Sequence, residues 1–123
     1  FYSKAHKNGL PNIRFAMGAD YIPEDNILSH YSEERTYNLI KQCRDCNFNA
    51  IRVWGGGIYP HDFFFDACDE YGPVVFNDLI FACMVVPDYR SMIDNIKAEI
   101  RENLVRLRHH ASVAVISGSK TRC

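Results

Sequence analysis

The chain has 123 residues, of which 47% are hydrophobic and 24% are charged, and its formal net charge is −1. This length suits one compact domain and is too short for two, and the composition is that of an ordinary globular protein. The small charge gives no reason to expect a nucleic-acid or anionic-membrane partner, and no apolar run approaches the roughly 20 residues of a membrane-spanning helix.

The cysteines and the first residues bear on the cellular setting. The start is no signal peptide, and Phe1 in place of Met suggests that the sequence begins inside a longer protein. Five cysteines form no even framework, which favours reduced thiols in a cytosolic-type setting over a disulfide-stapled secreted domain, although the compartment stays open. Cys43 and Cys46 have the spacing of half a zinc or redox site, but without a second pair we interpret them as ordinary helix cysteines.

The first third of the chain predicts a hairpin and a helix. Two β-prone runs, 1–7 and 12–17, flank a turn signal at 7–11, and we expect the second run, as 13–18, to be the first strand of the main sheet. Ser32 is a suitable N-cap for a helix that Asn47 would end. Its apolar face is predicted to consist of Leu39, Ile40, Cys43 and Cys46.

The middle of the chain predicts strand, helix and strand. A short β-branched run at 50–54 is followed by three glycines, 55–57, and Val74, Val75 and Phe76 form the next strand. Between them, a helix begins near Pro60 and ends at Gly72. Apolar residues in this helix recur at i, i+3, i+4 and i+7, the period of a half-buried helix: Phe64, Ala67, Cys68 and Tyr71. We expect the aromatic run 63–65 to pack in the core.

The last third predicts the clearest helix, after residues 87–88, and a fourth strand at 113–116. The apolar residues of this helix form one stripe, which consists of Ile93, Ile96, Ile100, Leu104 and Leu107. The opposite face of the helix is charged, and we expect it to be solvated. Strands that alternate with helices imply a parallel sheet of right-handed βαβ units. An open doubly wound sheet and a piece of a (β/α)₈ barrel both fit this order.

Polar residues at the expected strand ends favour the barrel, because barrel enzymes keep their sites there. They are Asp20, Arg52, Trp54, Asn77, Asp78 and residues 117–120. An open nucleotide-binding sheet would need a phosphate loop near its first strand, whereas the glycines at 55–57 follow the second strand and lack the required motif spacing. A nucleotide-binding α/β protein is therefore the weakest of the alternatives.

The string at 52–57, Arg-Val-Trp-Gly-Gly-Gly, resembles a segment of the β-mannosidases of glycoside hydrolase family 2. Segments 18–23, 68–72, 77–83 and 106–110 are similar to the same family in order and spacing. The resemblance covers nearly the whole chain. It implies an α/β fold in which residues 1–123 are the N-terminal half of a TIM barrel, with about four parallel strands and three helices after a short hairpin.

The resemblance implies retaining hydrolysis of terminal β-linked mannose from oligosaccharides, with no cofactor or metal. Such chemistry needs two carboxyl groups about 5–5.5 Å apart. The fourth strand of relatives ends in Gly-Asn-Asn-Glu, whose Glu is the acid/base; counted from His109 and His110, Lys120 takes the preceding Asn position and Thr121 the Glu position. A threonine hydroxyl is no general acid at neutral pH, and the nucleophile of relatives comes from a later strand. We therefore expect no catalytic residue in this chain, and no activity from it alone.

The resemblance also implies which residues contact the substrate: Arg52, Trp54, Asp78, Asp20 and Lys120. Trp54 would stack on a sugar, or else cap the barrel core. Arg52 and Asp78 would orient the sugar, or else form a structural ion pair. Asp20 departs from the family's usual Asn. We expect His109 and His110 to interact with a helix dipole rather than to act as ligands.

Two further interpretations stay open. A non-catalytic carbohydrate-binding or structural half-barrel module is the main alternative to an enzyme fragment. The family pattern ends after Gly118, which fits a reading-frame slip, a truncation or a sequence error. The unpaired edges of a half-barrel also predict marginal stability and self-association.

Overall fold

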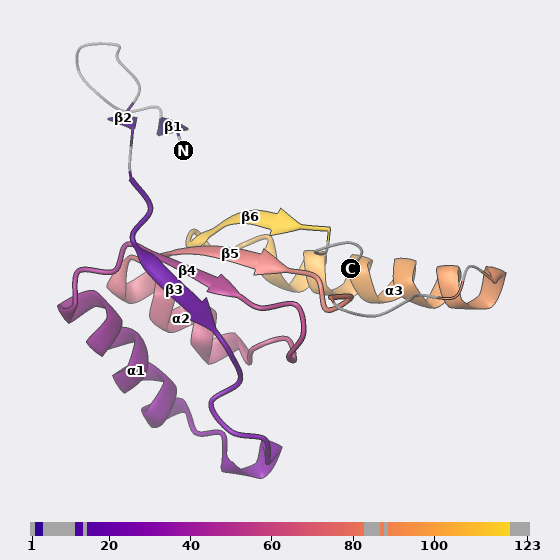
Figure 1. Ribbon diagram of the computed structural model, residues 1–123, viewed down its shortest axis with the longest axis horizontal. Coiled ribbons are helices and arrows are strands. Elements are labelled where there is room, and N and C mark those ends of the chain that lie inside the picture. The colour runs from indigo at the N-terminus through magenta and orange to yellow at the C-terminus, as the bar shows by residue number, and fades with distance from the viewer. Residues whose placement is uncertain (1, 4–11, 14, 83–86, 88, 119–123) are drawn as a thin grey trace.

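The computed structural model describes residues 2–3, 12–13, 15–82, 87 and 89–118. Strands and helices alternate along most of the chain, as predicted (Figure 1). In chain order the elements are β1 (Tyr2–Ser3), β2 (Asn12–Ile13), β3 (Gly18–Tyr21), the 3-10 helix η1 (Leu28–His30), α1 (Glu33–Asp45), β4 (Ala50–Val53), α2 (Asp62–Tyr71), β5 (Val74–Asp78), α3 (Arg90–Leu107) and β6 (Val113–Ser117).

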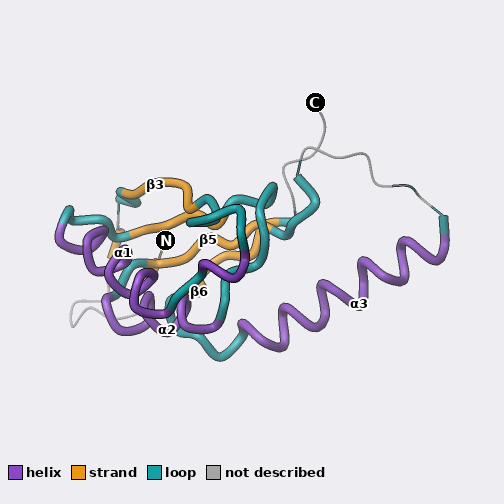
Figure 2. The backbone as a smooth tube through the Cα atoms, turned by 90° about the horizontal axis from the view of Figure 1, so that it is seen from below, coloured by secondary structure: helices purple, strands orange, loops and turns teal. Residues whose placement is uncertain are grey.

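The main sheet has four parallel strands in the order β3-β4-β5-β6, so that spatial order follows chain order. A doubly wound sheet would place its first strand in the middle, whereas sequential order is that of a barrel. The helices α1 and α2 pack together and lie on the same face of the sheet (Figures 1 and 2). The short hairpin is confirmed as the antiparallel pair of β1 and β2. The α/β class and the partial-barrel arrangement are therefore confirmed.

The first strand of the sheet is Gly18–Tyr21, so its prediction at 13–18 was wrong. Asn49 explains the difference, because its side chain accepts a hydrogen bond from the Met17 N–H (2.8 Å) and donates one to the Phe15 carbonyl (2.9 Å). The Met17 N–H and the Phe15 carbonyl therefore form hydrogen bonds with the Asn49 side chain instead of with a neighbouring strand. At Gly18, an added Cβ would lie only 1.7 Å from the Ala50 carbonyl oxygen, so glycine is required where β3 meets β4.

The helix α1 begins as predicted, with the Ser32 hydroxyl accepting a hydrogen bond from the Arg35 N–H (3.2 Å). Asn47, with φ 63°, follows its end. Ile40 is fully buried, but Cys46 is exposed, so its place on the apolar face was wrong: the helix ends at Asp45 and Cys46 is the C-cap. Besides Ile40, the buried residue of α1 is Thr36, in its first turn.

The core lies between the sheet and the pair α1 and α2. Phe64, Phe65, Ala67 and Cys68 of α2 are fully buried, as predicted. They pack with residues from the strands and the other two helices: Tyr21, Ile40, Ile51, Val53, Val75 and Leu107. Burial raises the pKa of the Cys68 and Cys43 thiols, so both are protonated at neutral pH.

The helix α3 packs only in part. Leu107 at its end is buried, but Leu104 is 39% exposed and the other residues of the predicted stripe are half-buried. Figure 2 shows that much of α3 extends away from the sheet, which agrees with this partial exposure. Within the described residues, no helix is both long and apolar enough to cross a membrane. Self-association through such surfaces stays a prediction.

Gly72 generates a stability prediction. It caps α2 in the left-handed region at φ 91°, and a Cβ built there would meet no atom within 4 Å. The cost of Gly72→Ala is therefore backbone strain alone, and we expect the free energy of unfolding to fall by about 1 kcal/mol in urea titrations followed by circular dichroism. Gly118→Ala is the control, because its Cβ also meets nothing and its φ is not left-handed. Equal losses in the two variants would contradict this account.

Candidate functional site

The candidate site lies where three neighbouring strands end. Parallel strands bring their carboxyl ends to one edge of the sheet, so Asp20 of β3, Arg52 of β4 and Asp78 of β5 are neighbours. Asp20 is paired in register with Arg52, and Arg52 with Phe76. Because residues two apart on a strand share a face, Asp78 points to the same face of the sheet as the other two.

Arg52 joins the two carboxylates. Its Nη1 atom donates to both oxygens of Asp20 (3.2 and 3.1 Å), and its Nη2 atom donates to Asp78 Oδ2 (2.5 Å). The Asp78 side chain is only 4% exposed, against 50% for Asp20. A buried carboxylate is costly unless a cation pairs with it, and Arg52 supplies that cation. The hydrogen bond to Asp78 in turn raises the pKa of Arg52, which keeps the guanidinium charged.

Trp54 lies in the turn that leaves β4. Its backbone N–H donates to the Tyr21 carbonyl (3.1 Å). Its backbone carbonyl accepts from the Gly57 N–H (3.3 Å), and this hydrogen bond closes the turn. The Gly55 N–H, one residue on, points to Asp78 Oδ2 (3.4 Å). The indole is half-buried. The structure thus brings Asp20, Arg52 and Asp78 together, with Trp54 in the adjoining turn, whereas Lys120 and Thr121 lie outside the described residues.

Glu24 was missed by the sequence interpretation. Its side chain is only 6% exposed, and Oε1 accepts from the Tyr21 hydroxyl (3.0 Å) and the Thr36 hydroxyl (2.6 Å). Arg35 lies 3.5 Å from Oε2. Burial and the nearby Glu24 carboxylate raise the pKa of Tyr21. This cluster ties the loop after β3 to α1 and so fixes the strand end that carries Asp20. An acidic residue in a loop gave no pattern by which to find it.

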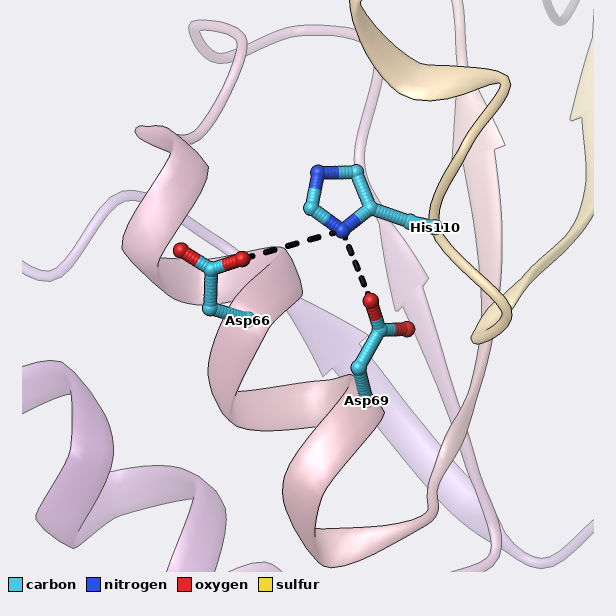
Figure 3. A group of neighbouring side chains, drawn as sticks. All are labelled: Asp66, Asp69 and His110. Atoms are coloured by element: carbon cyan, nitrogen blue, oxygen red, sulfur yellow. Dashed lines mark hydrogen bonds and ion pairs between the residues drawn. The ribbon is translucent and has the colours of Figure 1, made fainter.

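A second polar group consists of Asp66, Asp69 and His110 (Figure 3). Asp66 and Asp69 are on α2, and His110 precedes the start of β6. The group is therefore at the opposite end of β6 from Ser117. His110 Nδ1 is 2.8 Å from Asp69 Oδ2 and 3.9 Å from Asp66 Oδ1. Because a carboxylate only accepts, Nδ1 carries the proton. The expected helix-dipole role of His110 was therefore wrong, since its ring is buried against a carboxylate of α2.

This second group has the spacing of a metal site, because its potential ligand atoms all lie within 4.8 Å of one another. Its hydrogen bonds give a simpler account. Asp69 Oδ1 accepts from the Ser112 N–H (2.7 Å) while Oδ2 accepts from His110, so both carboxylate oxygens are engaged. We interpret the group as a link that joins α2 to the residues leading into β6.

Comparison with known proteins agrees with the fold and with the family that the sequence resembles. No protein-family model matches the chain. It is 41% identical over 109 residues to β-mannosidase B of Thermothelomyces thermophilus, covering 88% of this chain and 13% of that protein. It is 37% identical over 119 residues to the β-mannosidase of Capra hircus, covering 97% of this chain and 13% of that protein. The chain thus spans about an eighth of the length of these curated relatives.

A solved structure gives the same result. The crystal structure of the β-D-mannosidase from Dictyoglomus thermophilum matches with a TM-score of 0.85 and 38% sequence identity, over 91% of this chain and 14% of that one. The fold is therefore that of a partial (β/α)₈ barrel of a glycoside hydrolase. Within that class the chain is β-mannosidase-like, of glycoside hydrolase family 2.

The Asp69 link predicts a pH-dependent stability. Partial burial tends to raise the pKa of Asp69, but hydrogen bonds from Ser112 and His110 outweigh it and lower the pKa below its usual value. A lowered pKa in the folded state stabilises the fold above the unfolded-state pKa, and the contribution is lost as the pH falls through the folded-state pKa. Asp69→Asn should therefore lower the free energy of unfolding by on the order of 1–2 kcal/mol at pH 7, and by less under acidic conditions in which the chain still folds.

Urea unfolding over a pH series measures this difference. Asp66→Asn is the matched control, because Asp66 is 56% exposed and lies 3.9 Å from His110, so we expect it to change stability little at any pH. If the free energy of unfolding that Asp69→Asn loses does not depend on pH, or if Asp66→Asn loses as much, the Asp69 link makes no pH-dependent contribution to stability.

Proposed function

We propose that this chain forms part of the sugar-binding mouth of a barrel that hydrolyses terminal β-linked mannose from oligosaccharides with retention. The observation that carries the proposal is the Arg52 bridge between Asp20 and Asp78 at the strand ends, next to the turn that holds Trp54. The names of the relatives support the substrate class. On this proposal residues 1–123 are the N-terminal half of the barrel domain.

The side chains offer the contacts that a sugar needs. Asp78 Oδ2 is engaged by Arg52, while its Oδ1 takes no hydrogen bond from the described residues and can accept one from a sugar hydroxyl. A guanidinium has five N–H groups, so Arg52 retains donors beyond those directed at the two carboxylates. The indole of Trp54 offers an apolar face for the C–H groups of a pyranose and an N–H for a hydroxyl.

Two positions depart from the pattern that the family resemblance implies. Asp20 stands where the family resemblance implies Asn. In our proposal the Arg52 cation compensates the added negative charge, and the Asp20 carboxylate can still accept a hydrogen bond from a sugar hydroxyl. Lys120 is proposed to contact substrate as well. A cation that contacts the substrate would disfavour the positive charge that develops on the sugar during hydrolysis.

The 123-residue polypeptide should bind without turnover. Asp20 and Asp78 both pair with Arg52, and the family resemblance implies that Thr121 takes the acid/base position. The same ion pairs favour the second candidate function, a non-catalytic carbohydrate-binding half-barrel. The two candidates share the sugar contacts and differ only in whether further strands complete the chemistry.

We expect no hydrolysis of an aryl β-mannoside by this polypeptide above a heat-killed control. General acid–base assistance alone is worth roughly 10²–10⁴-fold, and the covalent route needs a second carboxylate. The double substitution Lys120→Asn and Thr121→Glu should restore nothing, because it supplies only one of the two groups. Release of the aryl group by either protein would refute this account, and Asp78→Asn would then test whether Asp78 is the nucleophile.

Binding should be measurable where turnover is not. Titration calorimetry with methyl β-mannoside should give saturable heat for the unaltered chain, and Trp54→Ala should weaken binding by about tenfold, the effect of losing an aromatic contact of roughly 1.4 kcal/mol. Tyr89→Ala is the matched control, since Tyr89 is 57% exposed and lies at the start of α3. No heat from the unaltered chain, or equal weakening by the control, would count against a sugar site at Trp54.

A further inference from the structure

The turn after β4 contains three consecutive glycines, yet its backbone does not require them. Of the described glycines only Gly72 has a positive φ, so Gly55, Gly56 and Gly57 adopt angles open to any residue. The Trp54 carbonyl and the Gly57 N–H close an ordinary turn. Conformational freedom therefore does not explain the string, and the absence of side chains must.

Each of the three glycines leaves space for a different neighbour. A Cβ on Gly55 would lie 2.6 Å from the Leu79 carbonyl oxygen, just past β5, and a Cβ on Gly57 would lie 2.8 Å from the Pro23 ring, past β3. These two contacts fix the turn against the strand on either side. At Gly56 the neighbour is the indole of Trp54, whose Cζ2, Cη2 and Cε2 atoms would lie 2.1, 2.4 and 2.6 Å from an added Cβ.

The Gly56 contact differs in kind from the other two. Gly56 is exposed, and the three nearest atoms to its Cβ position all belong to the one indole. None of these three atoms belongs to the backbone, so a side chain at position 56 would conflict first with the indole. The benzene edge of Trp54 therefore lies directly on the Gly56 backbone, and any residue other than glycine must displace the ring.

We propose that Gly56 is a positioning residue that sets the orientation of the Trp54 indole. The ring folds back on its own turn, and its edge rests on Gly56. This holds the half-buried ring in one orientation, in the turn that adjoins Asp20, Arg52 and Asp78. The inference deepens the proposed sugar site, because it names the group that fixes the angle of the stacking surface, and it rests on that site only for the role of the ring in binding.

The orientation can be tested without a ligand, since Trp54 is the only tryptophan in the chain. The long-wavelength near-UV circular dichroism of the chain therefore reports this one ring. Gly56→Ala should abolish or invert that band and raise acrylamide quenching of the fluorescence, with an unchanged far-UV spectrum. Gly118→Ala, whose Cβ meets nothing within 4 Å, is the matched control and should leave both signals unchanged. An unaltered near-UV band in folded Gly56→Ala would overturn the proposal.

A double-mutant cycle covers the case in which Gly56→Ala destabilises the chain. If its only conflict is with the indole, the same substitution should change the unfolding midpoint little in a Trp54→Ala background. Equal destabilisation in both backgrounds would show that Gly56 serves the backbone instead and would overturn the proposal.

The ligand adds a separate measurement. Gly56→Ala should weaken binding of methyl β-mannoside by about tenfold, as expected when an aromatic contact is misaligned, whereas the off-site control Tyr89→Ala should not. Absence of binding by the unaltered chain would refute the proposed function while leaving the ligand-free test of Gly56 intact. Unchanged affinity in Gly56→Ala, with a changed near-UV band, would overturn the role of this orientation in binding.

Discussion

The ion pair between Arg52 and the buried Asp78 is the interaction on which the candidate site depends. A carboxylate that is 4% exposed is unfavourable without a cation, and only the sequential order of the parallel strands brings the two residues to one edge. The Nη1 atom of the same guanidinium then reaches Asp20 at the end of β3. One arginine therefore joins the ends of three strands and sets the charge of the mouth at the same time.

The rest of the chain holds those strand ends in place. Glu24 ties the loop after β3 to α1, and the glycine turn packs between the ends of β3 and β5. At the other end of the sheet, His110 and Ser112 bind Asp69 and anchor the start of β6 to α2. These contacts are polar and local, while the hydrophobic core beneath the sheet provides most of the burial. These contacts hold the strand ends at which we propose that a sugar binds.

The sequence predicted elements better than it predicted contacts. Apolar periodicity identified α2 and its buried face, and alternation of strands and helices predicted the parallel sheet. The first strand was misplaced because residues 13–18 look like a strand, whereas the side chain of Asn49 occupies their backbone groups. The Arg52–Asp78 pair could be expected from polar residues at strand ends, but Glu24 could not, because its partners lie on separate elements. The contact of Gly56 with Trp54 required coordinates, since a glycine string reads equally well as a flexible turn.

The most direct test of a sugar site at this mouth is a two-dimensional ¹H–¹⁵N NMR titration of the chain with methyl β-mannoside. One tryptophan gives one indole N–H resonance, which reports Trp54 alone. Our account expects this resonance to shift with saturation, together with the Arg52 side-chain Nε–H, while the amides of Asp69 and Ser112 at the opposite end of the sheet stay fixed. An indole resonance that does not move at saturating sugar, or shifts confined to residues away from the strand ends, would contradict it.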